Sequence, residues 1–221
     1  NYPWVAEKLL HATGFTEVGE LALATPPAPD IRRLQPSLVP QMLGAIAGNL
    51  RFYKHFRLFE IARIFTSEWS QPDGMENLPV QPRHVAAALV GDDPASLFLQ
   101  ARGIVESLSR ATQIQPLSLC TQASPIPWAD PRAQLCICAD NKPIGAIGVV
   151  SSRAKRLAGI RRAEIVIFSF DVDALQPLPS RENQYTPLPT HPQVHFDLSF
   201  LVRLPVTWSE AKQLVQESHP L

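Results

Sequence analysis

The stretch FRLFEIARIF, residues 56–65, has the two-residue alternation of a β-strand. The alternation puts two apolar sets on opposite faces: Phe56, Leu58, Ala62 and Ile64 on one, and Phe59, Ile61 and Phe65 on the other. Glu60 falls on the first face, among apolar neighbours. A carboxylate in such a place must be paired, protonated or used for binding. Glu60 is therefore the first candidate functional residue, as a catalytic group, a substrate clamp or a structural acid.

Length and composition set the broad class of the protein. A chain of 221 residues with 45% hydrophobic residues is long enough for one or two domains with a sizeable core. The formal net charge is zero, so any binding to nucleic acid must be local. No signal peptide and no apolar run of membrane-spanning length occurs, and the first residue is not Met. We expect an excised segment of a cytoplasmic protein.

Three cysteines, Cys120, Cys136 and Cys138, are an odd and sparse set. This number argues against a disulfide framework and for a reducing compartment. Cys136 and Cys138 alternate in QLCICA and so share one strand face. Core packing is favoured over metal binding for this pair, because no second pair of ligands lies nearby in the sequence. We expect no metal site.

Hydrophobic periodicity predicts the order of helices and strands. Helices are expected at 3–13, 36–50, 95–112, 151–158 and 208–218. Strands are expected at 17–24, 56–65, 84–91, 116–121, 134–139, 144–150, 164–173 and 195–203. The turn DNKP, residues 140–143, predicts a hairpin between two of these strands.

A change of composition follows the strand at 164–173. The stretch 175–193 carries five prolines without periodicity, which is typical of a linker. After it come one strand pattern and one helix pattern, and Thr207 and Glu210 form a capping box at the helix start. One strand and one helix cannot bury a core alone. We therefore expect a truncated second domain.

Five segments, taken in order, resemble the bacterial phenylalanyl-tRNA synthetase β subunit. They are RRLQPSLVPQMLGAIAGNLRFYKHFRLFEIARIF (32–65), FLQARGIVESL (98–108), PIGAIGVVSSRAKR (143–156), FSFDVDAL (168–175) and HPQVHFDLSFLV (191–202). The sequence departs from the family pattern at Gln35, Arg102, Ser151, Ser152 and Phe196, and WADPRAQL (128–135) keeps only part of another family motif.

The resemblance implies an α+β fold with a class II aminoacyl-tRNA synthetase-like antiparallel sheet flanked by helices. That catalytic-like but non-catalytic domain would span 1–175, a Pro-rich linker 176–190, and the first strand and helix of a truncated ferredoxin-fold anticodon-binding domain 191–221. In that family the β-subunit copy has lost its chemistry and serves as a scaffold that pairs with the α subunit. The resemblance thus implies the α subunit and tRNA(Phe) as partners, and ATP and Mg²⁺ as cofactors of the holoenzyme but not of this segment.

The residues agree with a loss of chemistry. An adenylate site needs arginines to neutralise the triphosphate. By the resemblance, one of them would belong to a Gly-x-Gly-x-x-x-Arg motif at the position of the late strand 164–173. This strand has no glycine and offers Asp171 and Asp173 instead, which would repel ATP. We interpret these two aspartates as solvated groups at a strand edge and turn. By the resemblance, Leu58 and Glu60 replace a Gln and Glu that bind the substrate ammonium in the α subunit. We expect Glu60 to be a vestige held by a backbone donor or a nearby arginine; the alternative is a surviving ligand-binding role.

A basic segment provides another candidate contact. It consists of Arg153, Lys155, Arg156, Arg161 and Arg162. These residues could face tRNA phosphate or an acidic partner surface, although a solvated helix is the favoured interpretation. The leading hypothesis is a non-catalytic fragment of the synthetase β subunit. The alternatives are an active class II-like amino-acid-binding or ligase domain using Glu60, and a freestanding interaction module.

Overall fold

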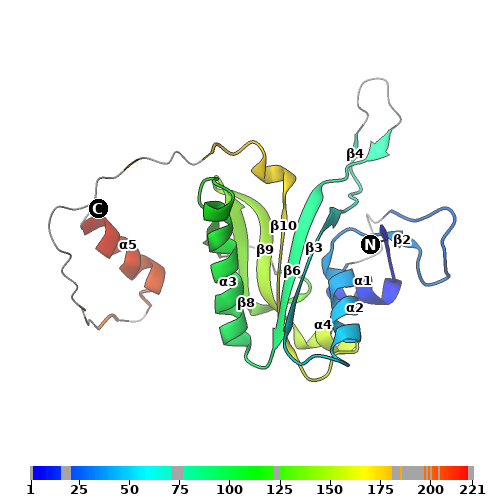
Figure 1. The fold of residues 1–221 in the computed structure, drawn as a ribbon, viewed down its shortest axis with the longest axis horizontal. Coiled ribbons are helices and arrows are strands. Elements are labelled where there is room, and N and C mark those ends of the chain that lie inside the picture. The colour runs from blue at the N-terminus through cyan, green and yellow to red at the C-terminus, as the bar shows by residue number, and fades with distance from the viewer. Residues whose placement is uncertain are drawn as a thin grey trace. The chain divides into compact units, whose positions relative to one another are not determined.

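The computed structural model describes residues 2–15, 21–70, 77–121 and 125–180, and then 185, 197, 199, 201–203 and 205–218. The chain divides into two compact units, Asn1–Glu182 and Asn183–Leu221. The first unit contains a sheet with helices on both sides, and the second contains one helix in its described part (Figure 1).

The main sheet of the first unit has six strands in its described residues, in the order β3-β6-β10-β9-β8-β7. Their bounds are Phe56–Arg63 (β3), Arg83–Gly91 (β6), Ser118–Cys120 (β7), Ala129–Ala139 (β8), Lys142–Val150 (β9) and Glu164–Asp171 (β10). Every neighbouring pair is antiparallel. The expected antiparallel sheet flanked by helices is confirmed.

Helices divide the two faces of the sheet between them. The helices of the first unit are Glu7–Thr13 (α1), Val39–Asn49 (α2), Pro94–Ala111 (α3) and Ser152–Leu157 (α4). Residues of α1, α2 and α4 share one core with the face that carries Ala86 and Ile167, which we call the α2 face. Residues of α3 share a second core with the opposite face, which carries Phe168 and Phe170 and which we call the α3 face.

The helices follow local sequence signals. In α2, Met42 and Ile46 are buried at four-residue spacing, and Pro40 lies in the first turn where its missing N–H costs nothing. The Asp93 side chain caps α3 by accepting a hydrogen bond from the Ala95 N–H at 3.0 Å. Ser151 caps α4 in the same way, through the Ala154 N–H at 3.2 Å.

The hairpin expected at 140–143 is confirmed between β8 and β9. Ala139 pairs with Lys142, and the two turn residues Asp140 and Asn141 have φ values of 48° and 59°. Two left-handed residues give the turn whose twist matches that of the flanking strands. Asn and Asp tolerate this conformation better than other side chains do.

The N-terminal region differs from the sequence-based expectation. The first helix begins at Glu7 rather than residue 3, because Trp4–Val5 (β1) pairs with Arg33–Leu34 (β2). Of the strand expected at 17–24, residues 16–20 lie outside the described residues, and Ala22 forms only an isolated bridge to Arg33. The polar connection after β3 contains a small ribbon of Trp69–Ser70 (β4) and Leu78–Pro79 (β5), which the sequence did not indicate.

Two strands of the main sheet have different bounds from those expected. Strand β8 begins at Ala129 instead of 134, and its register with β9 shifts between Ala129 and Gln134, where Pro131 lacks a donor for the ladder. Strand β10 stops at Asp171, because the chain turns into a 3₁₀ helix, Asp173–Leu175.

The second unit contains helix α5, Trp208–Ser218, as expected. Its capping box is confirmed: the Thr207 N–H donates to Glu210 Oε2 at 2.6 Å, and the Glu210 N–H donates to Thr207 Oγ1 at 3.3 Å. Of the strand expected at 195–203, Phe196, Leu198 and Phe200 lie outside the described residues, and 201–203 is irregular. In the described parts of both units, helices fall short of the length and apolarity needed to cross a membrane.

Candidate functional site

Glu60 begins a row of side chains that crosses the entire sheet. Strand pairing places each member directly opposite the next, so all project from the α2 face. In order, the row is Glu60, Ala86, Ser169, Ala146, Cys136 and Cys120. The position of Glu60 on the same face as Leu58 and Ala62 is as the alternation predicted.

The Glu60 side chain is half-buried and incompletely paired. Its Oε1 atom is buried and has no hydrogen-bond partner. The backbone or arginine donor that the sequence-based interpretation expected is therefore missing for this oxygen. Burial raises the pKa of Glu60 above its ordinary value of 4.5, because desolvation penalises the carboxylate.

The row does not suit a nucleoside triphosphate. Glu60 is its only ionisable group besides the thiols, and its other members are small: two alanines and a serine. A triphosphate would need cationic side chains or a metal ion to offset its charge. The side chains of this row offer no cation for that purpose.

Asp171 and Asp173 lie at the end of β10 and in the following turn, as expected, and both also have structural roles. The Asp171 side chain accepts hydrogen bonds from the Asp173 and Ala174 N–H groups at 2.8 and 3.3 Å, which starts the 3₁₀ helix. Asp173 accepts from the Arg83 N–H at 2.8 Å and pairs with the Arg83 guanidinium at 2.6 Å. These contacts lower the pKa of Asp173, with the backbone hydrogen bond as the largest cause. Both carboxylates are therefore already used by the fold.

The basic segment separates into one engaged lysine and four arginines. Lys155 Nζ lies 2.7 Å from Glu164 Oε1 and donates to the Ala163 carbonyl at 3.2 Å, so it anchors α4 to β10. The four arginines are exposed: Arg153, Arg156, Arg161 and Arg162. Arg161 and Arg162 line a polar pocket of about 480 Å³ together with Lys54 and Asp92.

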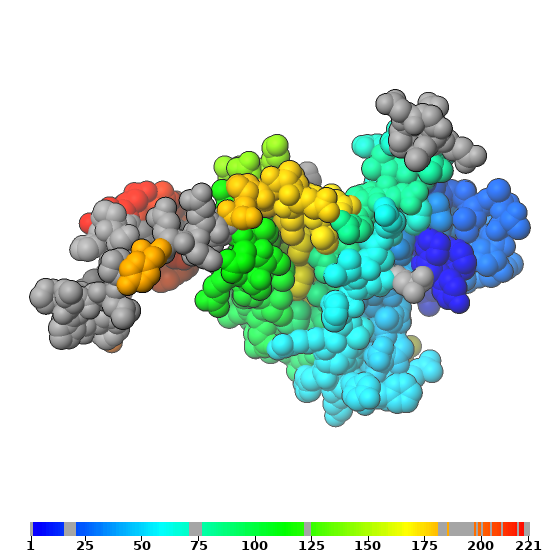
Figure 2. Space-filling model, turned by 45° about the horizontal axis from the view of Figure 1, so that its top comes forward, coloured from blue at the N-terminus to red at the C-terminus, as the bar shows by residue number. Residues whose placement is uncertain are grey.

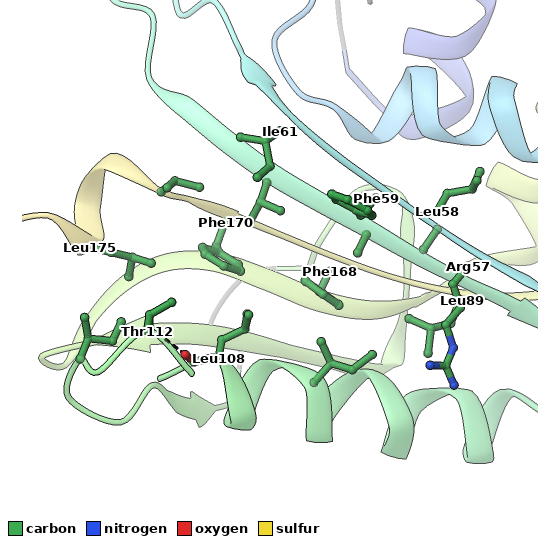
Figure 3. A pocket seen from close by; sticks show the side chains of 16 residues that line it. Arg57, Leu58, Phe59, Ile61, Leu89, Leu108, Thr112, Phe168, Phe170 and Leu175 are labelled. Carbon is green, nitrogen blue, oxygen red and sulfur yellow. Dashed lines mark hydrogen bonds between the residues drawn. The ribbon is translucent and has the colours of Figure 1, made fainter. Parts of the chain in front are cut away.

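An apolar groove on the α3 face was not expected from the sequence. It has a volume of about 480 Å³ and lies between α3 and strands β3, β6 and β10. Figure 2 shows α3 in green beside the cyan surface of the region around β3, with the yellow segment around the 3₁₀ helix above both. Leu108 of α3 and the side chains of Phe168 and Phe170 line its inner part (Figure 3).

The outer wall of the groove is formed by the edge strand β3. Phe59 is 78% exposed and Ile61 is 60% exposed, although both are large apolar side chains. In the described part of the chain, β3 is the end strand of the six-stranded sheet. The alternation of residues 56–65 correctly predicted that these two side chains share a face. That α3 leaves this face partly exposed to solvent is visible only in the structure. Large exposed apolar patches are typical of interaction surfaces.

This groove should bind apolar probes in the isolated chain. We expect the double variant Phe59→Thr/Ile61→Thr to reduce the fluorescence of an apolar dye by roughly half, because it removes the exposed apolar wall. Threonine is β-branched and suits a strand, so the variant should keep β3 intact. Leu99→Gln is the matched control, since Leu99 is 66% exposed on α3 and does not line the groove. Equal dye fluorescence in the double variant and the parent would contradict this assignment.

The cysteines end the row at the far edge of the sheet. Cys136 and Cys138 are buried on one strand face, as expected, and all three thiols are free. The structure adds Cys120, which is the direct partner of Cys136 on β7. Sequence reasoning did not include Cys120 in the pair, because strand pairing between β7 and β8 is not visible in local periodicity.

Comparison with known proteins identifies the family. The family model for the phenylalanyl tRNA synthetase beta chain CLM domain matches residues 1–172. This chain belongs to that family. The resemblance recognised in the sequence is therefore confirmed over the whole of the main sheet and its helices.

Curated relatives of this CLM-domain chain carry one common name. The phenylalanine–tRNA ligase beta subunit of Xylella fastidiosa is 28% identical over an alignment of 228 residues. The alignment covers 98% of this chain and 27% of that protein. The subunit of the same name from Lactiplantibacillus plantarum is 26% identical and is matched over 94% of this chain and 26% of its own length. The chain spans about a quarter of the length of these relatives.

Solved structures show the same fold at low identity. The pyrrolysyl-tRNA synthetase of Desulfitobacterium hafniense aligns with a TM-score of 0.61 and 15% identity, covering 79% of this chain and 60% of that one. A second structure of the enzyme from this organism gives a TM-score of 0.60 and 16% identity. The likeness shows that this CLM-domain chain has a synthetase-like sheet, and it does not bear on activity.

Proposed function

We propose that this chain is a segment of a phenylalanyl-tRNA synthetase β subunit that acts as a non-catalytic scaffold in the cytoplasm. It would pair with the α subunit, which would carry out the ATP- and Mg²⁺-dependent charging of tRNA(Phe). The observation that carries the proposal is the match of the CLM family model to residues 1–172. The lack of cationic side chains in the Glu60 row supports a scaffold over an enzyme.

Within this proposal the exposed arginines are the candidates for contact with tRNA phosphate or with an acidic partner surface. These are Arg153, Arg156, Arg161 and Arg162. Lys155 is excluded from this role because Glu164 and the Ala163 carbonyl already hold its ammonium group. Arginine suits phosphate because its planar group can donate two parallel hydrogen bonds.

The second unit would be the beginning of a ferredoxin-like anticodon-binding domain. Helix α5 is amphipathic, and its apolar residues Trp208, Leu214 and Val215 are 72%, 65% and 54% exposed. An amphipathic helix normally packs its apolar side against other elements of its domain. The remaining strands of such a domain would provide that cover.

The proposal is tested by measuring both amino-acid activation by the chain and its assembly with the α subunit. We expect the chain alone to show no phenylalanine-dependent exchange between pyrophosphate and ATP, because the row of side chains that begins with Glu60 offers no cation to hold the triphosphate. We also expect it to co-elute with the α subunit of the same organism in size-exclusion chromatography after co-expression. The α subunit expressed alone is the control for its elution volume.

The opposite outcomes identify the alternative function. Exchange by the isolated chain that is abolished by Glu60→Gln would establish an active amino-acid-binding domain, and the scaffold proposal would be wrong. A chain that neither exchanges nor co-elutes, although circular dichroism shows it folded, would equally contradict pairing with the α subunit.

A further inference from the structure

The three cysteines meet in space although Cys120 is 16 residues from its strand partner. The Sγ atoms of Cys120 and Cys138 lie 2.9 Å apart, and those of Cys138 and Cys136 lie 3.7 Å apart. All three Sγ atoms lie within 4.8 Å of one another. Two are buried on β8 and the third is exposed on the edge strand β7. The cluster is therefore closed on one side and open to solvent on the other.

We propose that Cys120, Cys136 and Cys138 form a three-thiolate site for a thiophilic metal ion of the zinc or copper(I) class. Thiolate sulfur is the ligand that selects these ions. With Zn–S bonds of about 2.3 Å, tetrahedral geometry separates two sulfurs by roughly 3.8 Å. The Cys136–Cys138 separation of 3.7 Å is close to this value, and the shorter Cys120–Cys138 separation of 2.9 Å would have to widen as the side chains rotate to seat an ion.

The strand register disfavours a disulfide between the two closest sulfurs. The closest sulfur pair belongs to Cys120 and Cys138, but the Cα partner of Cys138 on β7 is Ser118, so the two cysteines are diagonal neighbours. Diagonal Cα atoms across an antiparallel pair are about 7–8 Å apart, beyond the usual range of about 4.4–6.8 Å for a disulfide. A metal ion needs only the sulfur atoms to converge.

The ligand set leaves one coordination position open. Among the described residues, no histidine, aspartate or glutamate joins the three thiols within the same 4.8 Å. A tetrahedral zinc ion would complete its shell with water on the exposed side near Cys120, whereas copper(I) accepts three thiolates alone. Each thiol would release its proton to solvent as the ion binds. This site is independent of the proposed scaffold function.

Burial affects the protonation of the two thiols on β8. Burial raises the pKa of Cys138 to about 12, and burial also raises the pKa of Cys136. A buried neutral thiol is a poor nucleophile. The two buried thiols are therefore not suited to nucleophilic chemistry, and a metal ion must displace their protons to bind.

The test is metal titration of the reduced, metal-free chain. Cd²⁺ serves as the optical probe for the zinc arm, because thiolate ligands give it an ultraviolet charge-transfer band, and Zn²⁺ is then added to displace it. A parallel anaerobic titration with Cu⁺ against a competing chelator distinguishes the second ion. We expect one ion per chain in at least one arm.

Substitutions at the exposed position give the sharpest comparison. Loss of an outer-shell partner already costs about 10–100-fold in metal affinity, so we expect Cys120→Ser to lower affinity by at least about 100-fold. Cys120→His should still bind zinc. Its Cd²⁺ complex should show a charge-transfer band weaker by roughly one third, because imidazole replaces one of three thiolates. Ser118→Ala is the matched control on β7 and should bind as the parent does.

Three outcomes would overturn the proposal. The first is a folded, reduced chain that takes up none of the ions at one per chain. The second is full affinity in Cys120→Ser. The third is failure of Cys120→His to bind zinc any better than Cys120→Ser, since a true ligand position accepts imidazole.

Discussion

Replacing Gly145 with alanine is expected to lower the free energy of unfolding by at least about 3 kcal/mol, at the upper end of overpacking effects. Gly145 lies in β9 opposite Phe170 of the central strand β10. A Cβ atom at this position would collide with the Ser169 carbonyl oxygen and with Phe170 Cα and Cβ. Two of these three atoms belong to the backbone, so the collision can be relieved only by separating β9 from β10.

Gly103 provides the matched control for that substitution. A Cβ atom at Gly103 meets no heavy atom within 4 Å, and the residue lies in the middle of α3. Gly103→Ala should therefore raise stability by about 0.5–1 kcal/mol, as glycine is a poor helix former. Urea unfolding followed by circular dichroism measures both values. Similar stabilities for the two variants would show that β9 and β10 do not pack as closely as described.

The second large effect concerns Glu60. We expect Glu60→Lys to lower the free energy of unfolding by about 3 kcal/mol, because it puts an ammonium group where one carboxylate oxygen is already buried without a partner. Ile61→Lys, on the exposed face of the same strand, should change stability by less than about 1 kcal/mol. Urea midpoints of the two lysine variants compare the faces directly. Equal losses would contradict the burial of Glu60.

Glu60→Gln should act in the opposite direction and depend on pH. Folding raises the pKa of Glu60. At a pH above this raised pKa, the ionised carboxylate lowers the free energy of unfolding. At a pH below the ordinary pKa of the group, it is protonated in both states and the effect disappears. The amide removes the charge, and the gain at pH 7 should be at most about 1 kcal/mol because solvent screens a half-buried group. The gain should shrink toward zero as the pH falls below 4.5, the ordinary value. A gain that does not change between neutral and acid pH would argue against this origin.

The sequence predicted those structural features that depend on residues close to one another in the chain. The face of Glu60, the Asp140–Asn141 turn and the Thr207–Glu210 capping box each rest on residues within a few positions of one another. Their outcomes agree with the structure because strand alternation, turn chemistry and helix capping are set by the adjacent chain.

Features that depend on distant pairing were not predicted. Cys120 joins Cys136 only through the β7–β8 register, and Asp173 meets Arg83 across 90 residues. The early strand Trp4–Val5 was taken for helix because its partner, Arg33–Leu34, lies far along the chain. Periodicity carries no information about which strand lies beside which, so the groove and the thiol cluster required the fold.

The strand order has a consequence for how the chain folds during synthesis. Strand β10 is the last of the six in the sequence, yet it lies between β6 and β9. Before Glu164 leaves the ribosome, β3 and β6 can pair with each other and β7, β8 and β9 can form a second piece, but the two half-sheets have no common strand. Each then offers an unpaired inner edge, and such edges invite association with other chains. The arrival of eight residues, Glu164–Asp171, joins both edges at once. Nascent chains stalled just before this segment should therefore depend on chaperones, and those stalled beyond it should not.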